Sequence, residues 1–192
     1  MRSTPPLPEA SVIRRLIREG RQSEALSGAR ALAASGSPEG DLLLGWMHQS
    51  GAAVPQDLDE AERYYIRAAE HGSSLGMFYL GWFYATAGDL TRAVEWFQRS
   101  STTGCPAATY HLGRMHLVGQ GVEQNHNRAM ELFATAAHQG HLYARRNIAR
   151  EMATGKRGLV RIPLGILEVL QVGFLFVSIG LKDPDSERLL RI

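Results

Sequence analysis

A repeated set of landmarks constrains the fold of this chain most strongly. A Leu-Gly pair recurs at residues 44–45, 80–81 and 112–113, and a weaker Ile-Ala copy follows at 148–149, at intervals of 36, 32 and 36 residues. A period between 20 and 50 residues is typical of helical solenoids. The sequence therefore predicts an all-α chain of stacked repeats. Two further series keep the same steps: Ala25, Ala61, Ala93 and Ala129, and Gly36, Gly72, Gly104 and Gly140.

Each repeat is predicted to contain two helices. The first helix includes the glycine of the Leu-Gly pair, which would let a neighbouring helix approach closely. The second helix opens at Asp57, Asp89 or Asn125, whose side chains are good N-caps because they accept from free backbone amides. Asp57 and Glu60 together resemble a capping box. The closing glycine of each unit is expected to end the second helix.

The stretch from Cys105 to Gly140 carries a family resemblance. Its landmarks are Leu112-Gly113, Gly119-Gln120-Gly121-Val122, Asn125, Ala129, Phe133, Ala136-Ala137 and Gly140. This pattern is similar to the Sel-one-like repeat, a relative of the tetratricopeptide repeat. Residues 41–72 match it as well, whereas residues 73–104 lack the Gly-x-Gly-Val loop and resemble an ordinary tetratricopeptide unit. The resemblance covers about residues 8–155 and implies a right-handed α–α superhelix of helix pairs.

The expected organisation follows from these landmarks and from shifts in composition. A proline-rich leader at 1–8 lacks the apolar core of a secretory signal, so we expect the repeats to lie in the cytoplasm. A solenoid at 9–155, a basic linker at 156–161, a hydrophobic helix at 162–181 and a polar tail at 182–192 follow. Within the solenoid the repeats are expected at about 9–36, 37–72, 73–104 and 105–140, with a partial repeat at 141–155.

Composition and spacing argue against several function classes. A net charge of +2 does not call for a nucleic acid partner, and a single cysteine, Cys105, excludes an intramolecular disulfide. The seven histidines show no metal-ligand spacing, and no nucleophile motif or phosphate-binding loop is present. We therefore expect a protein without catalytic residues, cofactor or metal.

Two ladders of first-helix positions form the candidate partner-binding surface. In solenoids built from helix pairs, the concave side binds extended ligands. Both ladders pass from apolar residues to arginines, which suits a protein segment with an apolar anchor at one end and an acidic group or terminal carboxylate at the other. The alternative for the aromatic members, Trp46 and Phe78 above all, is burial in the core. The ladders are Trp46, Trp82, Arg114 and Arg150, and Leu42, Phe78, Tyr110 and Arg146.

Residues 162–181 form a second candidate functional segment. As a helix, this apolar stretch would be about 30 Å long, which matches the hydrocarbon thickness of a bilayer. The basic residues before it would keep the repeats in the cytoplasm. The alternative is a helix that lies on the solenoid, because Glu168, Gln171, Ser178 and Lys182 share one stripe. The apolar members of the segment include Ile162, Leu167, Phe174, Phe176 and Leu181.

The leading hypothesis is a non-catalytic adaptor that binds a protein segment on its concave face and is tethered to a membrane through residues 162–181. One alternative is a soluble structural subunit whose C-terminal helix caps the solenoid or forms a homodimer. The other is a periplasmic ligand-binding or enzymatic repeat protein, which would need a signal that the first ten residues do not supply.

Overall fold

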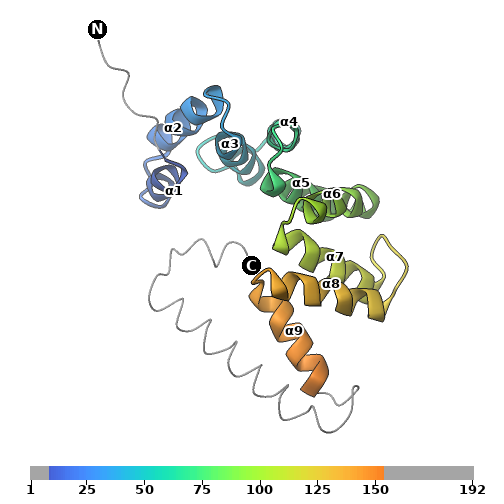
Figure 1. Cartoon of the computed structure of the whole chain (residues 1–192). Coiled ribbons are helices and arrows are strands. Elements are labelled where there is room, and N and C mark those ends of the chain that lie inside the picture. Colours follow the sequence, from blue (N-terminus) through green and yellow to red (C-terminus); the bar gives the residue numbers. More distant parts are fainter. Residues whose placement is uncertain (1–8, 154–192) are drawn as a thin grey trace. The chain divides into compact units, whose positions relative to one another are not determined.

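The computed structural model describes residues 9–153, and these residues form helices and no strand (Figure 1). The predicted all-α class is confirmed for this part of the chain. The leader at 1–8, the linker, the segment at 162–181 and the tail lie outside the described residues. The helices are α1 (Ala10–Arg18), α2 (Gln22–Ala34), α3 (Pro38–Ser50), α4 (Leu58–Glu70), α5 (Ser74–Thr86), α6 (Leu90–Thr102), α7 (Pro106–Val118), α8 (His126–His138) and α9 (Leu142–Ala153).

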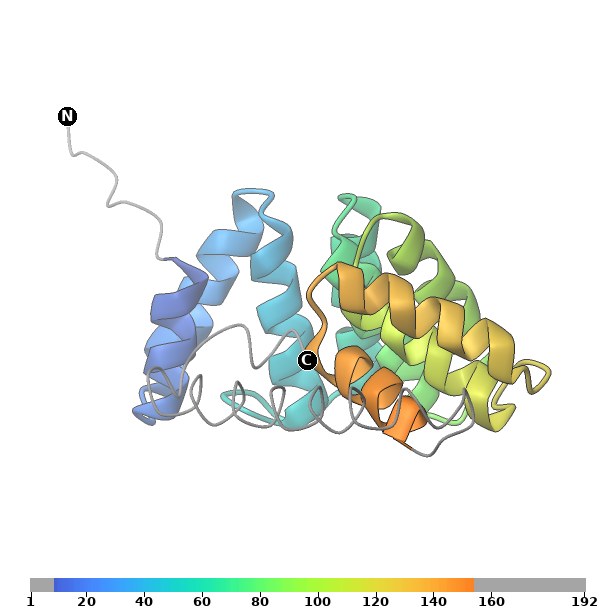
Figure 2. The same ribbon diagram turned by 60° about the horizontal axis from the view of Figure 1, so that its bottom comes forward.

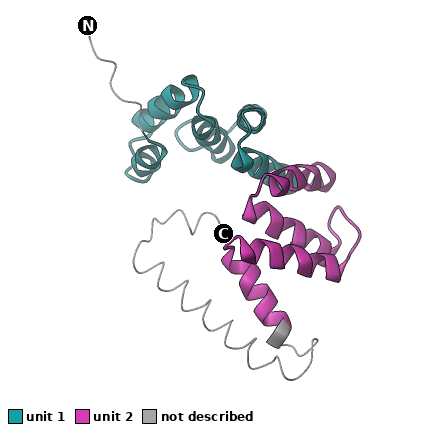
Figure 3. Ribbon diagram, viewed as in Figure 1, with its two compact units in different colours: residues 1–88 teal, residues 89–192 magenta. Residues whose placement is uncertain are grey.

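The helices fall into two compact units, which divide at Gly88 (Figure 3). In the first unit α1 to α5 pack in chain order, each on the next, and in the second unit α6 to α9 do the same (Figures 1 and 2). The core of the first unit includes Ile13, Leu44 and Met47. The core of the second unit is built around Tyr110 and Phe133.

The predicted N-caps are confirmed. The side chains of Asp57, Asp89 and Asn125 each accept from the amide three residues ahead, at 2.9, 3.0 and 2.9 Å, and so open α4, α6 and α8. The capping box at Asp57 is only half formed. The Asp57 amide donates to the His48 carbonyl at 2.9 Å, and the Glu60 carboxylate pairs with Arg63 instead of reaching back.

The glycine of the Leu-Gly pair is a close-contact position in both full-length repeats. A Cβ at Gly45 would lie 2.7 Å from the ring of Tyr65 on α4, and a Cβ at Gly113 would lie 2.7 Å from the ring of Phe133 on α8. Any larger residue would push the two helices of the repeat apart. The small residue expected at this position is therefore required by the aromatic ring of the following helix.

The loops after α3 and α7 share one backbone conformation and one glutamine hydrogen bond. Gly51 and Gly119 end the helices in the left-handed region, with φ of 74° and 80°. The side-chain amides of Gln56 and Gln124 then donate through Nε2 to the backbone carbonyls of Gln49 and Leu117 on the preceding helix, at 2.8 and 2.9 Å. The third shared position is held by Ala53 in one loop and Gly121 in the other, and both have a φ of 70°.

Among the helices of residues 9–153, none combines the length and the apolar character needed to cross a bilayer.

The two loops offer a matched stability test. Ala53→Gly should stabilise the protein by about 0.5 to 1 kcal/mol, because an alanine at positive φ is strained. Gly121→Ala should cost about 2 kcal/mol or more, because the new Cβ would be strained and would lie 2.7 Å from the Leu90 carbonyl oxygen. Denaturant unfolding of both variants measures these changes, and a loss of stability in Ala53→Gly would contradict the shared loop geometry.

Candidate functional site

The first unit presents two exposed tryptophans at equivalent repeat positions. Trp46 on α3 is 38% exposed and Trp82 on α5 is 41% exposed, so the core interpretation does not hold for either side chain. Leu42 and Phe78, one turn earlier on the same helices, are half-buried. Helix α5 contains no charged residue. These four apolar residues are called here the aromatic face, and its two tryptophans are exposed to solvent.

The contact of the first helix with the second orients this face. Gly45 is buried against the ring of Tyr65, and the next residue along a helix points about 100° away. Trp46 therefore turns away from α4 and toward solvent. Gly113 and Arg114 repeat this arrangement on α7, where Gly113 is buried against Phe133 and Arg114 is exposed.

The second unit presents arginines at the corresponding positions. Arg114 on α7 and Arg146 and Arg150 on α9 are exposed, and we call them the basic face. The guanidinium of Arg146 lies 4.8 Å from the centre of the Tyr143 ring, which is a cation–π contact. Tyr143 stands three residues before Arg146 on α9, and residues at this spacing are neighbours on a helix surface. The sequence interpretation missed Tyr143.

Tyr110 differs from the other members of the predicted set because it is buried, with 8% of its surface exposed. Its ring stacks on His141 at 4.4 Å and also contacts Phe133 and Tyr143. Tyr110 therefore joins α7 to the start of α9 beneath the basic face and does not offer its ring to a partner.

His111 lies beside Tyr110 and stacks on Phe97 at 5.4 Å. The pKa of His111 is lowered from its ordinary 6.5 to about 4, chiefly by burial and also by the nearby charges of Arg114 and His141. His141 accepts a hydrogen bond from the Ala144 amide at 3.3 Å through Nδ1, as the N-terminal cap of α9. At neutral pH the positive charge of the face therefore comes from its arginines.

The repeats that carry these faces match a known family. The family model of the Sel1 repeat, the Sel-one-like unit, matches residues 38–73, 74–104 and 106–141, which together exceed half of the chain. The chain belongs to the Sel1 repeat family. The matched units begin within a residue or two of the predicted repeats at 37–72, 73–104 and 105–140.

Two curated relatives share part of the chain. A sel1-like repeat-containing protein of Acanthamoeba polyphaga mimivirus, L21, is 28% identical over 97 residues, which is 50% of this chain and 18% of the viral protein. An exopolysaccharide production negative regulator of Rhizobium leguminosarum bv. viciae is 29% identical over 142 residues, which is 65% of this chain and 53% of the regulator. The chain thus spans less than two thirds of the length of either relative.

Two solved structures share the fold. A Sel1 repeat protein from Oxalobacter formigenes superposes with a TM-score of 0.72 at 23% identity, over 95% of this chain and 83% of that one. The antigen c5321 of uropathogenic Escherichia coli, which displays an SLR fold, gives a TM-score of 0.68 at 23% identity, over 85% of this chain and 38% of that one. These likenesses place the described helices among Sel1 solenoids.

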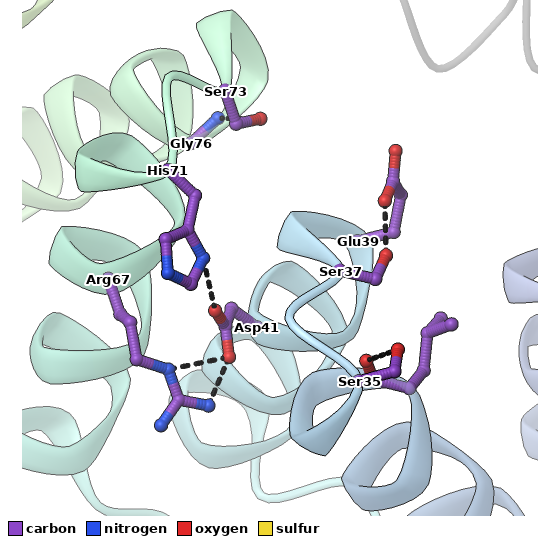
Figure 4. Close-up of polar contacts among 9 residues, drawn as sticks. Ser35, Ser37, Glu39, Asp41, Arg67, His71, Ser73 and Gly76 are labelled. Atoms are coloured by element: carbon purple, nitrogen blue, oxygen red, sulfur yellow. Dashed lines mark hydrogen bonds and ion pairs between the residues drawn. The ribbon is translucent and has the colours of Figure 1, made fainter.

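The first Sel1 repeat also holds a buried carboxylate that sequence reasoning missed. Asp41, in the first turn of α3, is fully buried, and its Oδ1 accepts from Arg67 Nε of α4 at 2.8 Å (Figure 4). His71 Nδ1 lies 3.6 Å from the other oxygen. Asp41 lies three residues before the leucine of its Leu-Gly pair, as Met77 and Thr109 do in the later repeats, and all three side chains are buried. Comparing this position between repeats could have identified Asp41 as a buried carboxylate.

This cluster joins the two helices of one Sel1 repeat and offers no nucleophile beside a base. A buried carboxylate needs a cationic partner, and Arg67 supplies one. Among residues 9–153 no group of three or more possible ligands is placed to hold a metal ion. We therefore assign the Asp41 cluster a structural role.

The second unit should lose stability in acid. In the unfolded chain, the imidazole of His111 takes up a proton below about pH 6.5. In the folded unit, the same imidazole stays neutral until about pH 4. Neutral His111 therefore contributes up to roughly 3 kcal/mol to the free energy of unfolding above pH 6.5, and this contribution is lost as the pH falls from 6.5 to about 4.

His111→Tyr should flatten this decline. Tyr79, the equivalent residue of the preceding repeat, stacks on Tyr65 at 5.9 Å, so the position accepts a tyrosine. The measurement is the denaturant midpoint between about pH 7 and pH 4.5, with the exposed His138→Tyr as the control. Equal acid sensitivity in wild type and His111→Tyr would disprove the role of His111.

Proposed function

We propose that this chain is a non-catalytic adaptor that binds a partner protein through the exposed faces of its first helices, α3 and α5 in one unit and α7 and α9 in the other. Sel1 repeats are a helical scaffold fold that generally mediates protein–protein interaction. The partner contacts proposed are the aromatic face and the basic face.

The observation that carries this proposal is the pair of exposed tryptophans. Trp46 and Trp82 each directly follow the glycine of a Leu-Gly pair and expose more than a third of their surface. Exposed tryptophan is costly to leave in water, and tryptophan and arginine are the residues most enriched at protein-binding hot spots. A relative named as a negative regulator is consistent with action through binding.

Variants of the two faces test the proposal. Trp82→Ala and Arg114→Glu should each weaken capture of partner proteins by the full-length chain at least about tenfold, because interface anchors dominate association. Their thermal midpoints should stay close to wild type. The controls are Leu58→Ala, an exposed apolar residue of α4, and Arg128→Glu, an exposed arginine of α8.

Two results would contradict this function. If the control variants lose binding as strongly as Trp82→Ala and Arg114→Glu, the first-helix faces are not the binding surface. If Trp82→Ala instead loses the roughly 3 to 5 kcal/mol of stability expected for a core aromatic, Trp82 stabilises the fold and is not a binding residue. A chain that captures only copies of itself would support the alternative of a structural subunit.

The membrane tether is proposed from sequence alone. The support is the twenty-residue apolar run at 162–181 with Lys156, Arg157 and Arg161 before it. The full-length protein should remain with membranes after high-salt and carbonate washes, and a chain ending at Gly155 should be released. A full-length protein that is monomeric in solution without detergent would refute the tether and favour a helix that caps the solenoid.

A further inference from the structure

The arginines of the second unit differ in how their charge is balanced. On the second helices, Arg92 pairs with Asp89 at 2.5 Å and Arg128 pairs with Glu131 at 2.9 Å. On the first helices, no carboxylate of the described residues pairs with Arg114, Arg146 or Arg150. Among the described residues, Arg92 and Arg128 are therefore neutralised by carboxylates, whereas Arg114, Arg146 and Arg150 are not.

The composition of the two first helices explains this difference. Helix α7 contains no Asp or Glu, and the only carboxylate of α9 is Glu151. Glu151 is engaged elsewhere, because His126 Nε2 of α8 lies 3.2 Å from its Oε1. Arg146 and Arg150 are also one turn apart on α9, a like-charge spacing that weakens a helix by a few tenths of a kcal/mol. Among the described residues of the unit, no carboxylate pairs with Arg146 or Arg150 to offset this repulsion.

The ring of Tyr143 holds the guanidinium of Arg146 in a fixed position. Tyr143 is half-buried and packs on Tyr110, so its ring is held in place. A guanidinium over an aromatic face keeps its in-plane N–H donors available, and those donors match the two oxygens of a carboxylate. Because the basic face has aromatic support and no carboxylate within residues 9–153 pairs with its arginines, its charge complements an acidic ligand.

We propose that the basic face, formed by Arg114, Arg146 and Arg150 with Tyr143 beneath, binds an acidic segment of a partner protein through glutamate or aspartate side chains. This proposal rests on the adaptor function above and names the chemistry of one of its two contacts. A protein segment fits better than a nucleic acid, because three arginines make only a short basic patch and the whole chain carries only +2.

The test uses the full-length protein in a non-ionic detergent and two synthetic fluorescent peptides with capped ends. One peptide alternates glutamate with serine, and the other replaces every glutamate by glutamine. Fluorescence anisotropy should show binding of the glutamate peptide that weakens as salt is added, and at least about tenfold weaker binding of the glutamine peptide.

Matched double variants locate the site. Arg114→Gln with Arg146→Gln should weaken binding of the glutamate peptide at least about tenfold, because two charge-assisted contacts are lost. Arg92→Gln with Arg128→Gln removes the same charge from α6 and α8 and should change the affinity less than about twofold, since those arginines already pair with carboxylates. Circular dichroism and the thermal midpoint check that both variants fold.

Three results would overturn the proposal. Equal losses in the two double variants would show that only net charge matters. Equal binding of the two peptides would exclude recognition of carboxylates. Binding of a duplex DNA or of anionic vesicles with no binding of the glutamate peptide would assign the face to another ligand. In each case Trp82→Ala could still weaken capture of partners, so the adaptor function would stand or fall separately.

Discussion

The contact between a first-helix glycine and an aromatic ring of the following helix determines how each full-length repeat is built. Gly45 lies against Tyr65 and Gly113 lies against Phe133, in both cases closer than a Cβ would allow. The contact places the two helices at short range, where the alanines of the second helix complete the core. It also fixes the rotation of the first helix, and so decides which residues reach solvent.

The exposed faces follow from that rotation. In both full-length repeats the residue after this glycine points away from the second helix, and it is Trp46 on α3 and Arg114 on α7. Trp82 holds the same repeat position on α5 and is also exposed. The same scaffold thus presents two chemistries without a change in backbone. This separation of scaffold and surface is typical of folds whose function lies in side chains added to a common framework. It explains how one repeat family can serve different partners.

The sequence predicted the parts of this structure that depend on local chemistry and on period. Asp57, Asp89 and Asn125 cap their helices, as expected, because a cap is a contact within one turn. Tyr110, by contrast, was expected on the surface and is covered by His141, a residue thirty-one positions away. Asp41 and Arg67 lie on different helices, so their pairing also depends on tertiary packing that no local pattern contains.

The central claim is that partners bind the first-helix faces, and the three tryptophans of the chain can test it in one spectrum. Trp46 and Trp82 lie on first helices, whereas Trp96 lies on the second helix α6, with Arg99 stacked 4.1 Å from its ring. Indole N–H resonances of the labelled full-length protein should be recorded with and without a bound partner. The account predicts that the Trp46 and Trp82 resonances shift and that of Trp96 does not. A shift confined to Trp96 would contradict it.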